Sequence, residues 1–117
     1  MADDRELMRS ALKAIFALRP DWQVCGEAQD YNEVLAKAPA LHPDLIIVDF
    51  KMPPFNGIES VREISALMPM VPIVMYTMYK TGELEAAAKR AGARAVVAKE
   101  DGVRQLLAAV DAELTAH

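Results

Sequence analysis

Five polar side chains stand where predicted strands end or where the following loops begin: Asp3, Asp4, Asp49, Thr77 and Lys99. In open parallel sheets, ligands bind outside the carboxyl ends of the strands, so these residues are expected to converge on one edge. Three carboxylates packed together repel one another unless a cation is present, and Mg²⁺ prefers carboxylate, carbonyl and water oxygens. A lysine and a hydroxyl on the same edge would complete a pocket for a phosphoryl group.

The elements that must position these residues alternate between helix and strand. Apolar residues recur at spacings of three and four in the segments 5–18, 58–68 and 103–114, which predicts amphipathic helices. The alanine-rich segment 83–91 is also predicted to be helical, with Gly92 as its C-terminal cap. Asp30 and Glu33 resemble a capping box that opens a further short helix to Ala38, with Pro39 and Pro43 bracketing the next loop. Apolar runs predict strands at 23–28, 45–48, 71–77 and 95–98. This order predicts an α/β fold with a doubly wound parallel sheet.

Four segments stand in a fixed order along the chain: the pair Asp3-Asp4, LIIVDFKMPPFNGIE from Leu45 to Glu59, IVMYT ending at Thr77, and GARAVVAKE from Gly92 to Glu100. Together they resemble a two-component response-regulator receiver domain, CheY-like and of the kind fused to NarL/LuxR-type DNA-binding domains. The resemblance covers essentially the whole chain, and the ordered set is far more specific than any one segment. It implies a flavodoxin-like fold and a single receiver domain over residues 1–117, with no output domain in the chain.

The resemblance also implies a role for each polar residue at the site. Asp49 would be the phosphoacceptor and one of the Mg²⁺ ligands. Asp4 would bind Mg²⁺ directly, Asp3 would act mainly through a water ligand, and the backbone carbonyl of Lys51 would supply a further oxygen. The phosphoryl group would come from a sensor histidine kinase or from a small donor such as acetyl phosphate.

Thr77 and Lys99 would bind the transferred phosphoryl group, and Thr77 would move inward with it. Gly57 would allow the tight turn after Met52-Pro53 that shapes the loop over Asp49. Phosphorylation would then shift the population between two arrangements of the face that carries the last two helices.

Departures from the family pattern affect how switching would work. Val96 stands where receivers with an aromatic switch have Tyr or Phe, and Glu100 stands where many have a proline after the lysine. Met78 is longer than the small residue common after the hydroxyl position, which suggests slow phosphorylation. Lys51 and Tyr79, each two residues beyond a site residue, are candidates for tuning dephosphorylation.

The start of the chain is the largest departure. Only Met1 and Ala2 precede the acidic pair, enough for about 7 Å of extended chain, whereas the first strand of the family fold is central. A central strand that is truncated or missing would leave unpaired backbone groups, each costing about 1–3 kcal/mol. Either the start is trimmed, or another segment or molecule fills the gap, for example through a homodimer that exchanges a strand or other element.

Composition excludes several other classes of protein. The net charge of −4 has no long basic block, which argues against direct nucleic-acid binding by this domain. No apolar run approaches the roughly 20 residues needed to span a membrane, and the charged N-terminus is unlike a signal peptide, so a cytoplasmic protein is expected. The single cysteine, Cys25, is expected to be a small buried residue rather than a redox centre.

Two other functions are considered beside the phosphoacceptor signalling domain, which is not expected to be an enzyme in its own right. A phosphatase of the haloacid-dehalogenase type would need a second aspartate two residues after the nucleophile, where Lys51 stands. A pseudo-receiver, acting as a phosphorylation-independent protein-binding or dimerisation module, is favoured by the short start but not by the retained set of five polar residues.

Overall fold

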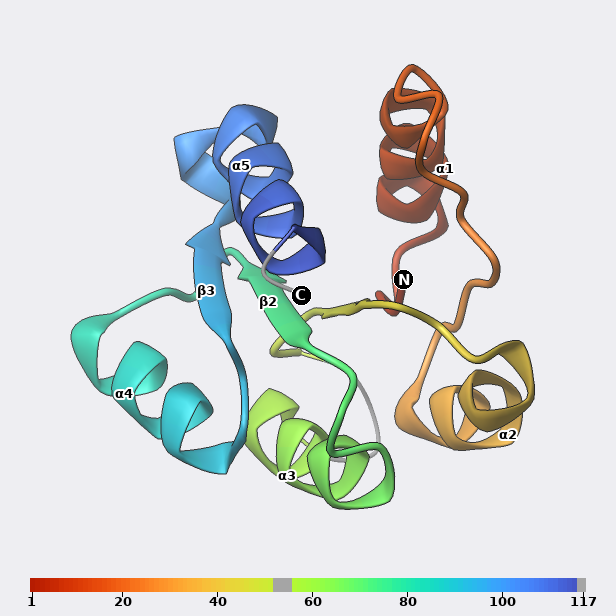
Figure 1. Ribbon diagram of the computed structural model, residues 1–117. Helices are drawn as coiled ribbons and strands as arrows, with labels where there is room; N and C mark the ends of the chain where they lie inside the picture. The colour runs from red at the N-terminus through yellow and green to blue at the C-terminus, as the bar shows by residue number, and fades with distance from the viewer. Residues whose placement is uncertain (52–55, 116–117) are drawn as a thin grey trace.

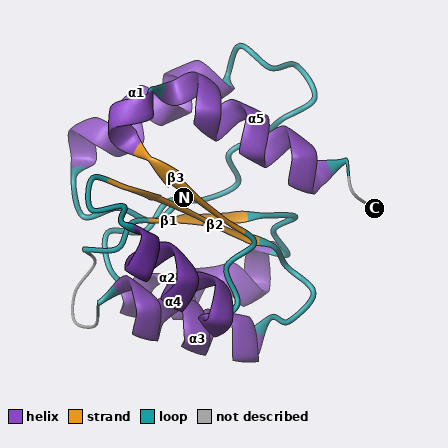
Figure 2. Ribbon diagram, turned by 90° about the vertical axis from the view of Figure 1, so that its left-hand side faces the viewer, coloured by secondary structure: helices purple, strands orange, loops and turns teal. Residues whose placement is uncertain are grey.

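A parallel sheet of three strands forms the centre of the computed structural model, which describes residues 1–51 and 56–115. Strands β1 (Ile46–Val48), β2 (Ile73–Thr77) and β3 (Ala95–Ala98) lie side by side in that order (Figure 1). Helices α1 (Glu6–Phe16) and α5 (Val103–Leu114) cover one face, and α2 (Tyr31–Leu41), α3 (Gly57–Leu67) and α4 (Gly82–Ala91) cover the other (Figure 2). The predicted α/β architecture is therefore confirmed.

The strands are buried on both faces, as the apolar run before Asp49 predicted. Every residue of β1 and β2 is buried. The register is parallel throughout, with Ile47 opposite Val74 and Val74 opposite Ala95. Because all strands point the same way, their carboxyl ends share one edge of the sheet.

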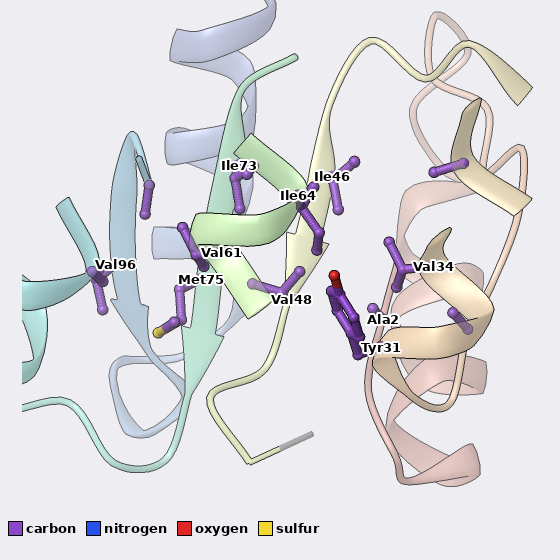
Figure 3. Close-up of a cluster of buried hydrophobic side chains, with 14 residues drawn as sticks. Ala2, Tyr31, Val34, Ile46, Val48, Val61, Ile64, Ile73, Met75 and Val96 are labelled. Carbon is purple, nitrogen blue, oxygen red and sulfur yellow. The ribbon is translucent and has the colours of Figure 1, made fainter. Parts of the chain in front are cut away.

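Two apolar clusters fix the strands between the helix layers. On the side of α2, α3 and α4, the fully buried side chains include Val48, Val61, Ile64, Ile73 and Met75 (Figure 3). On the side of α1 and α5, the cluster includes Leu12, Phe16, Val74, Leu106 and Val110. Truncating a core residue of this kind to alanine typically costs about 2–5 kcal/mol, so these clusters stabilise the sheet that carries the polar residues.

The N-terminal residues occupy the position of a central strand for the length of one pairing. Ala2 forms parallel bridges to both Ala28 and Val48. Its N–H donates to Ile47 O at 2.7 Å, and its carbonyl accepts from Asp49 N at 3.0 Å. The first strand is therefore truncated, as predicted. Its one remaining residue pair, at Ala2, still places Asp3 at the carboxyl edge of the sheet.

The strand predicted at 23–28 was wrong for most of its length. Only Ala28 takes part in a bridge, and residues 23–27 have no regular secondary structure. A strand cannot form here because the neighbouring N-terminal segment, Met1 and Ala2, offers almost no backbone groups for hydrogen bonding. For the same reason Cys25 is exposed and not buried as predicted.

Helix α2 does not end at Ala38 as predicted but continues through Pro39 to Leu41. A proline in the last turn removes a single backbone hydrogen bond, whereas the buried stripe of Tyr31, Val34 and Ala38 holds the helix against the sheet. The helix begins as predicted, since the Asp30 side chain accepts from Glu33 N at 2.8 Å. It stops at His42, which has a positive φ of 50°.

No helix within residues 1–51 and 56–115 has the length and apolar character that crossing a lipid bilayer requires.

Candidate functional site

The acidic site is assembled by the carboxyl ends of neighbouring strands. Asp3 follows the Ala2 bridge, Asp49 follows β1, and Lys99 follows β3 as the first residue of a 3₁₀ turn, η1 (Lys99–Asp101). Thr77 is the last residue of β2, which lies between β1 and β3. Thr77 pairs in register with Ala98, the residue before Lys99. Parallel pairing therefore brings residues from four distant parts of the sequence to one edge.

Three carboxylates meet at this edge. Asp3, Asp4 and Asp49 each offer an oxygen, and these oxygens lie within 4.8 Å of one another. Asp3 and Asp49 are buried, whereas Asp4 is exposed. Oxygens at this spacing can bind one hard divalent cation, and an exposed member gives the ion a route from solvent.

Lys99 is the cation that the structure places among these carboxylates. Its Nζ lies 2.8 Å from Asp3 Oδ2 and 3.2 Å from Asp49 Oδ2, and the side chain is only 6% exposed. These two short ion pairs offset part of the desolvation that burial imposes on the three charged groups. Oδ1 of Asp49 is buried and has no hydrogen-bond partner among the described residues.

Two arginines that the sequence pattern did not predict as site residues surround Asp3. Arg5 N–H donates to Asp3 Oδ1 at 2.9 Å, with the Arg5 Nε at 3.9 Å, and Arg9 Nη1 donates to the Asp3 backbone carbonyl at 2.7 Å. These bonds fix both the backbone and the side chain of Asp3. The only sequence signal was the spacing of Arg5 and Arg9, one helical turn apart directly after the acidic pair.

The Thr77 hydroxyl is buried and is oriented by its own loop. Its Oγ1 accepts a hydrogen bond from Tyr79 N at 3.1 Å. Met78 and Tyr79 are largely exposed, at 60% and 48%. The Lys51 ammonium lies 5.9 Å from the centre of the Tyr79 ring, so two of the predicted tuning residues lie next to each other at the surface.

Tyr76 and Val96 lie in the strands behind the site. Lys99 Nζ is 5.7 Å from the Tyr76 ring centre. Burial raises the pKa of the Tyr76 phenol, and the nearby Lys99 ammonium partly opposes this rise. Val96 is buried in the apolar cluster under α3 and α4. The position at which some receivers have an aromatic switch residue is therefore occupied by a core valine.

The loop after Asp49 is only partly described. Gly57 is needed there, because a Cβ at this position would collide with the Phe50 backbone, 2.9 Å from its carbonyl oxygen. Lys51 and Asn56 form an isolated antiparallel bridge. The turn expected at Met52-Pro53 lies outside the described residues.

Comparison with known proteins assigns nearly the whole chain to the family that the sequence motifs resemble. The family model for the response regulator receiver domain matches residues 1–111. The transcriptional regulatory protein LnrK of Bacillus subtilis (strain 168) is 31% identical over 117 residues, covering 100% of this chain and 52% of that protein. The DNA-binding transcriptional activator DevR/DosR of Mycobacterium tuberculosis is 34% identical over 110 residues, covering 94% and 51%. The chain thus spans about half the length of these curated relatives.

Solved structures agree in fold. A LuxR-family two-component response regulator from Aurantimonas sp. SI85-9A1 matches with a TM-score of 0.93 and 28% identity, over 99% of this chain and 83% of that one. The response regulator domain of Thermotoga maritima CheB matches with a TM-score of 0.82 and 32% identity, over 97% and 89%. Sequence, fold and the geometry of the acidic edge agree, and the chain belongs to the family of response regulator receiver domains.

Proposed function

We propose that this receiver domain accepts a phosphoryl group on Asp49, from a histidine kinase and with Mg²⁺ present. The observation that carries the proposal is the asymmetry of the Asp49 carboxylate: Oδ2 is held by Lys99 at 3.2 Å, whereas the buried Oδ1 has no hydrogen-bond partner among the described residues. A buried polar atom without a partner costs about 1–3 kcal/mol. Binding a cation or a phosphorus atom at that carboxylate removes this cost.

The acidic group fits a divalent cation because it offers three carboxylate oxygens within 4.8 Å of one another. We assign direct binding to Asp4 and Asp49, with Asp3 acting mainly through water and the Lys51 carbonyl adding a further oxygen. Asp3 suits the indirect role because Lys99 and Arg5 N–H already hold both of its oxygens. When bound, Mg²⁺ would offset the charge on the phosphoryl oxygens.

In the transfer step, one Asp49 oxygen forms a bond to phosphorus while the bond between phosphorus and the donor nitrogen of phosphohistidine breaks. The electron pair of that bond leaves with the histidine, and the product is an acyl phosphate on Asp49. Lys99 is placed to pair with the added negative charge. The Thr77 hydroxyl accepts from Tyr79 N, so its own hydrogen stays available for a phosphoryl oxygen.

The phosphorylated state would act by shifting the domain between two arrangements. The added charge of about −1.5 to −2 attracts Lys99 and the Thr77 hydroxyl, and both are attached to strands that pack under α4 and α5. With Val96 in the aromatic position, the shift would depend on Thr77 and its loop. Since related proteins are DNA-binding transcriptional regulators, we propose that residues 1–117 form one receiver domain that regulates a DNA-binding output domain.

Incubation with acetyl phosphate and MgCl₂, followed by intact-mass measurement, tests the proposal. One phosphoryl addition is expected for the wild-type chain, and none for Asp49→Asn or without Mg²⁺. Asp44→Asn makes the same chemical change on an exposed loop residue and is expected to behave as wild type. An unchanged wild-type mass would favour a phosphorylation-independent binding module instead.

A further inference from the structure

The Lys99 side chain has to reach across a strand to meet its two carboxylate partners. Strand β2 lies between β3, which ends next to Lys99, and β1, which ends next to Asp49. Neighbouring strands are about 4.8 Å apart, so the backbones of these two residues are separated by about 10 Å. Asp3 is farther away, because Ala2 pairs with Val48 on the edge of β1 opposite β2. The flexible four-carbon stem of Lys99 must therefore extend across the end of β2.

The side chain that lies beside this crossing is Tyr76. It is the next-to-last residue of β2 and pairs in register with Val97 on β3. Both side chains belong to the apolar cluster under α1 and α5. Lys99 Nζ lies over the Tyr76 ring, 5.7 Å from its centre. The ring thus meets the ammonium group where the lysine passes β2.

The contact between the ammonium group and the ring is shielded from water. Tyr76 is 6% exposed, and so is the Lys99 side chain. A cation within about 6 Å of a ring centre is attracted to the negative face of the π system, and this attraction is stronger where water is excluded. Burial raises the pKa of the Tyr76 phenol, so the ring is neutral at physiological pH. The Lys99 ammonium therefore faces a π system and not a phenolate.

The ring differs in one respect from the other two partners of Lys99. Asp3 and Asp49 belong to the acidic group that fits a divalent cation, and Asp49 is the proposed phosphoacceptor. Their oxygens attract Lys99 less strongly once they share their charge with a cation or form a bond to phosphorus. The Tyr76 ring takes part in neither event. Its attraction for the ammonium group is therefore the same in every state of the site.

We propose that Tyr76 is a positioning residue, whose ring holds the Lys99 ammonium at the acidic site so that it can pair with a phosphoryl group on Asp49. The inference rests on the proposed phosphoacceptor function, because pairing with the phosphoryl group is the step that a displaced lysine would slow. Without the ring, the stem of Lys99 samples more rotamers. Fewer molecules then have the ammonium group in place when the phosphodonor arrives.

Tyr76 is also a core residue, so the test has to separate its attraction for Lys99 from its packing. Tyr76→Phe and the incorporation of phenylalanines with one, two or three ring fluorines at position 76 keep the shape of the ring. Each fluorine withdraws negative charge from the ring face and so weakens its attraction for a cation. The initial rate of phosphorylation by acetyl phosphate with MgCl₂ is measured for each variant by intact mass. Tyr76→Phe should keep the rate within about twofold, and each added fluorine should lower it, to about a tenth with three.

Phe16 provides the matched control for loss or fluorination of a buried ring. It is buried in the same cluster as Tyr76, and its ring packs edge to face against Trp22. The same fluorinated phenylalanines at position 16, and Phe16→Leu, should leave the rate unchanged at a temperature well below unfolding. Tyr76→Leu, which removes the ring but keeps an apolar side chain, should lower the rate about tenfold.

A second measurement follows the Lys99 side chain itself and needs no phosphorylation. Protons near the face of an aromatic ring resonate upfield, so the ε-methylene NMR signal of Lys99 is expected upfield of those of the exposed Lys13 and Lys89. The signal is assigned through the backbone resonances of Lys99. It should keep its position in Tyr76→Phe and move toward the signals of the exposed lysines in Tyr76→Leu.

Equal phosphorylation rates across the fluorinated series would overturn the proposal, and so would a Lys99 signal that stays in place in Tyr76→Leu. If Tyr76→Leu does not fold, the fluorinated series decides, since it keeps the ring in its space. A wild-type chain that accepts no phosphoryl group would overturn the proposed function instead. The Lys99 signal then decides by itself whether the ring holds the ammonium group.

Discussion

The ammonium group of Lys99 lies 2.8 Å from Asp3 Oδ2 and 3.2 Å from Asp49 Oδ2, so a single buried cation joins the first and third acidic residues of the site. Lys99 is separated from Asp3 by 96 residues in the sequence. The contact therefore ties the start of the chain to the end of β3 across the whole sheet edge. It also means that Asp3 and Asp49 share a counter-ion when no metal is bound.

Replacing Lys99 by methionine should destabilise the metal-free protein. Two buried carboxylates would then lose their common counter-ion, which typically costs about 3–5 kcal/mol. Urea unfolding in EDTA measures the loss in free energy of unfolding, and added MgCl₂ should restore part of it. Lys89→Met, at an exposed position on α4, should change little. A Lys99 variant as stable as wild type in EDTA would mean that the ion pair contributes nothing.

Magnesium should raise the melting temperature of the wild-type chain but not that of Asp4→Asn. Asp4 is the variant of choice because its exposed side chain can be changed without disturbing the fold. A ligand that binds the folded state alone stabilises it by about 2.7 kcal/mol at one hundred times its dissociation constant. Differential scanning fluorimetry over a MgCl₂ series checks this, with Asp101→Asn as the charge-matched control. Equal shifts in wild type and Asp4→Asn would remove Asp4 from the metal site.

Thr77→Val should separate the role of the hydroxyl from that of the side-chain shape. Valine fills the same buried space but leaves Tyr79 N without its acceptor, which costs about 1 kcal/mol. Phosphorylation by acetyl phosphate should also slow, because no hydroxyl remains to donate to the phosphoryl oxygens. Thr77→Ser, which keeps the hydroxyl, should recover most of the rate. If valine and serine variants react equally fast, the hydroxyl has no part in the transfer.

Glu27 gives the protein an acid-sensitive contact away from the site. A hydrogen bond from Lys13 Nζ at 2.7 Å is the main cause that lowers the pKa of the Glu27 carboxyl below its usual value of 4.5. Because the folded-state pKa is lowered, the contact stabilises the protein above about pH 4.5, and this stability is lost as the pH falls through the folded pKa. Both side chains are partly exposed, so the gain is about 0.5 kcal/mol.

An NMR titration of the Glu27 side chain checks this prediction. In Lys13→Gln the pKa should rise toward 4.5, and the stability difference from wild type should disappear at low pH. Lys89→Gln serves as the surface control. A Glu27 pKa that does not move when Lys13 is replaced would assign the shift to another neighbour.

Much of the fold and of the acidic site could be predicted from the sequence, because the polar site residues stand directly at the ends of apolar strand segments. The run before Asp49 and the strand ending at Thr77 each place a functional residue at a carboxyl end, and a parallel sheet then brings them together. The strand at 23–28 could not be predicted correctly, because its formation depends on the backbone available beside it and not on its own pattern. The bonds that Arg5 and Arg9 make to Asp3 depend on how α1 leaves the sheet, which local periodicity does not specify.

The most direct test of the account is to find where the phosphoryl group resides. After reaction with acetyl phosphate and MgCl₂, borohydride reduction converts an aspartyl phosphate into homoserine, and peptide mass spectrometry locates the modified position. If Asp49 is the phosphoacceptor, homoserine is expected at position 49 and nowhere else. Modification of another carboxylate, or of no residue while the site is saturated with Mg²⁺, would contradict it.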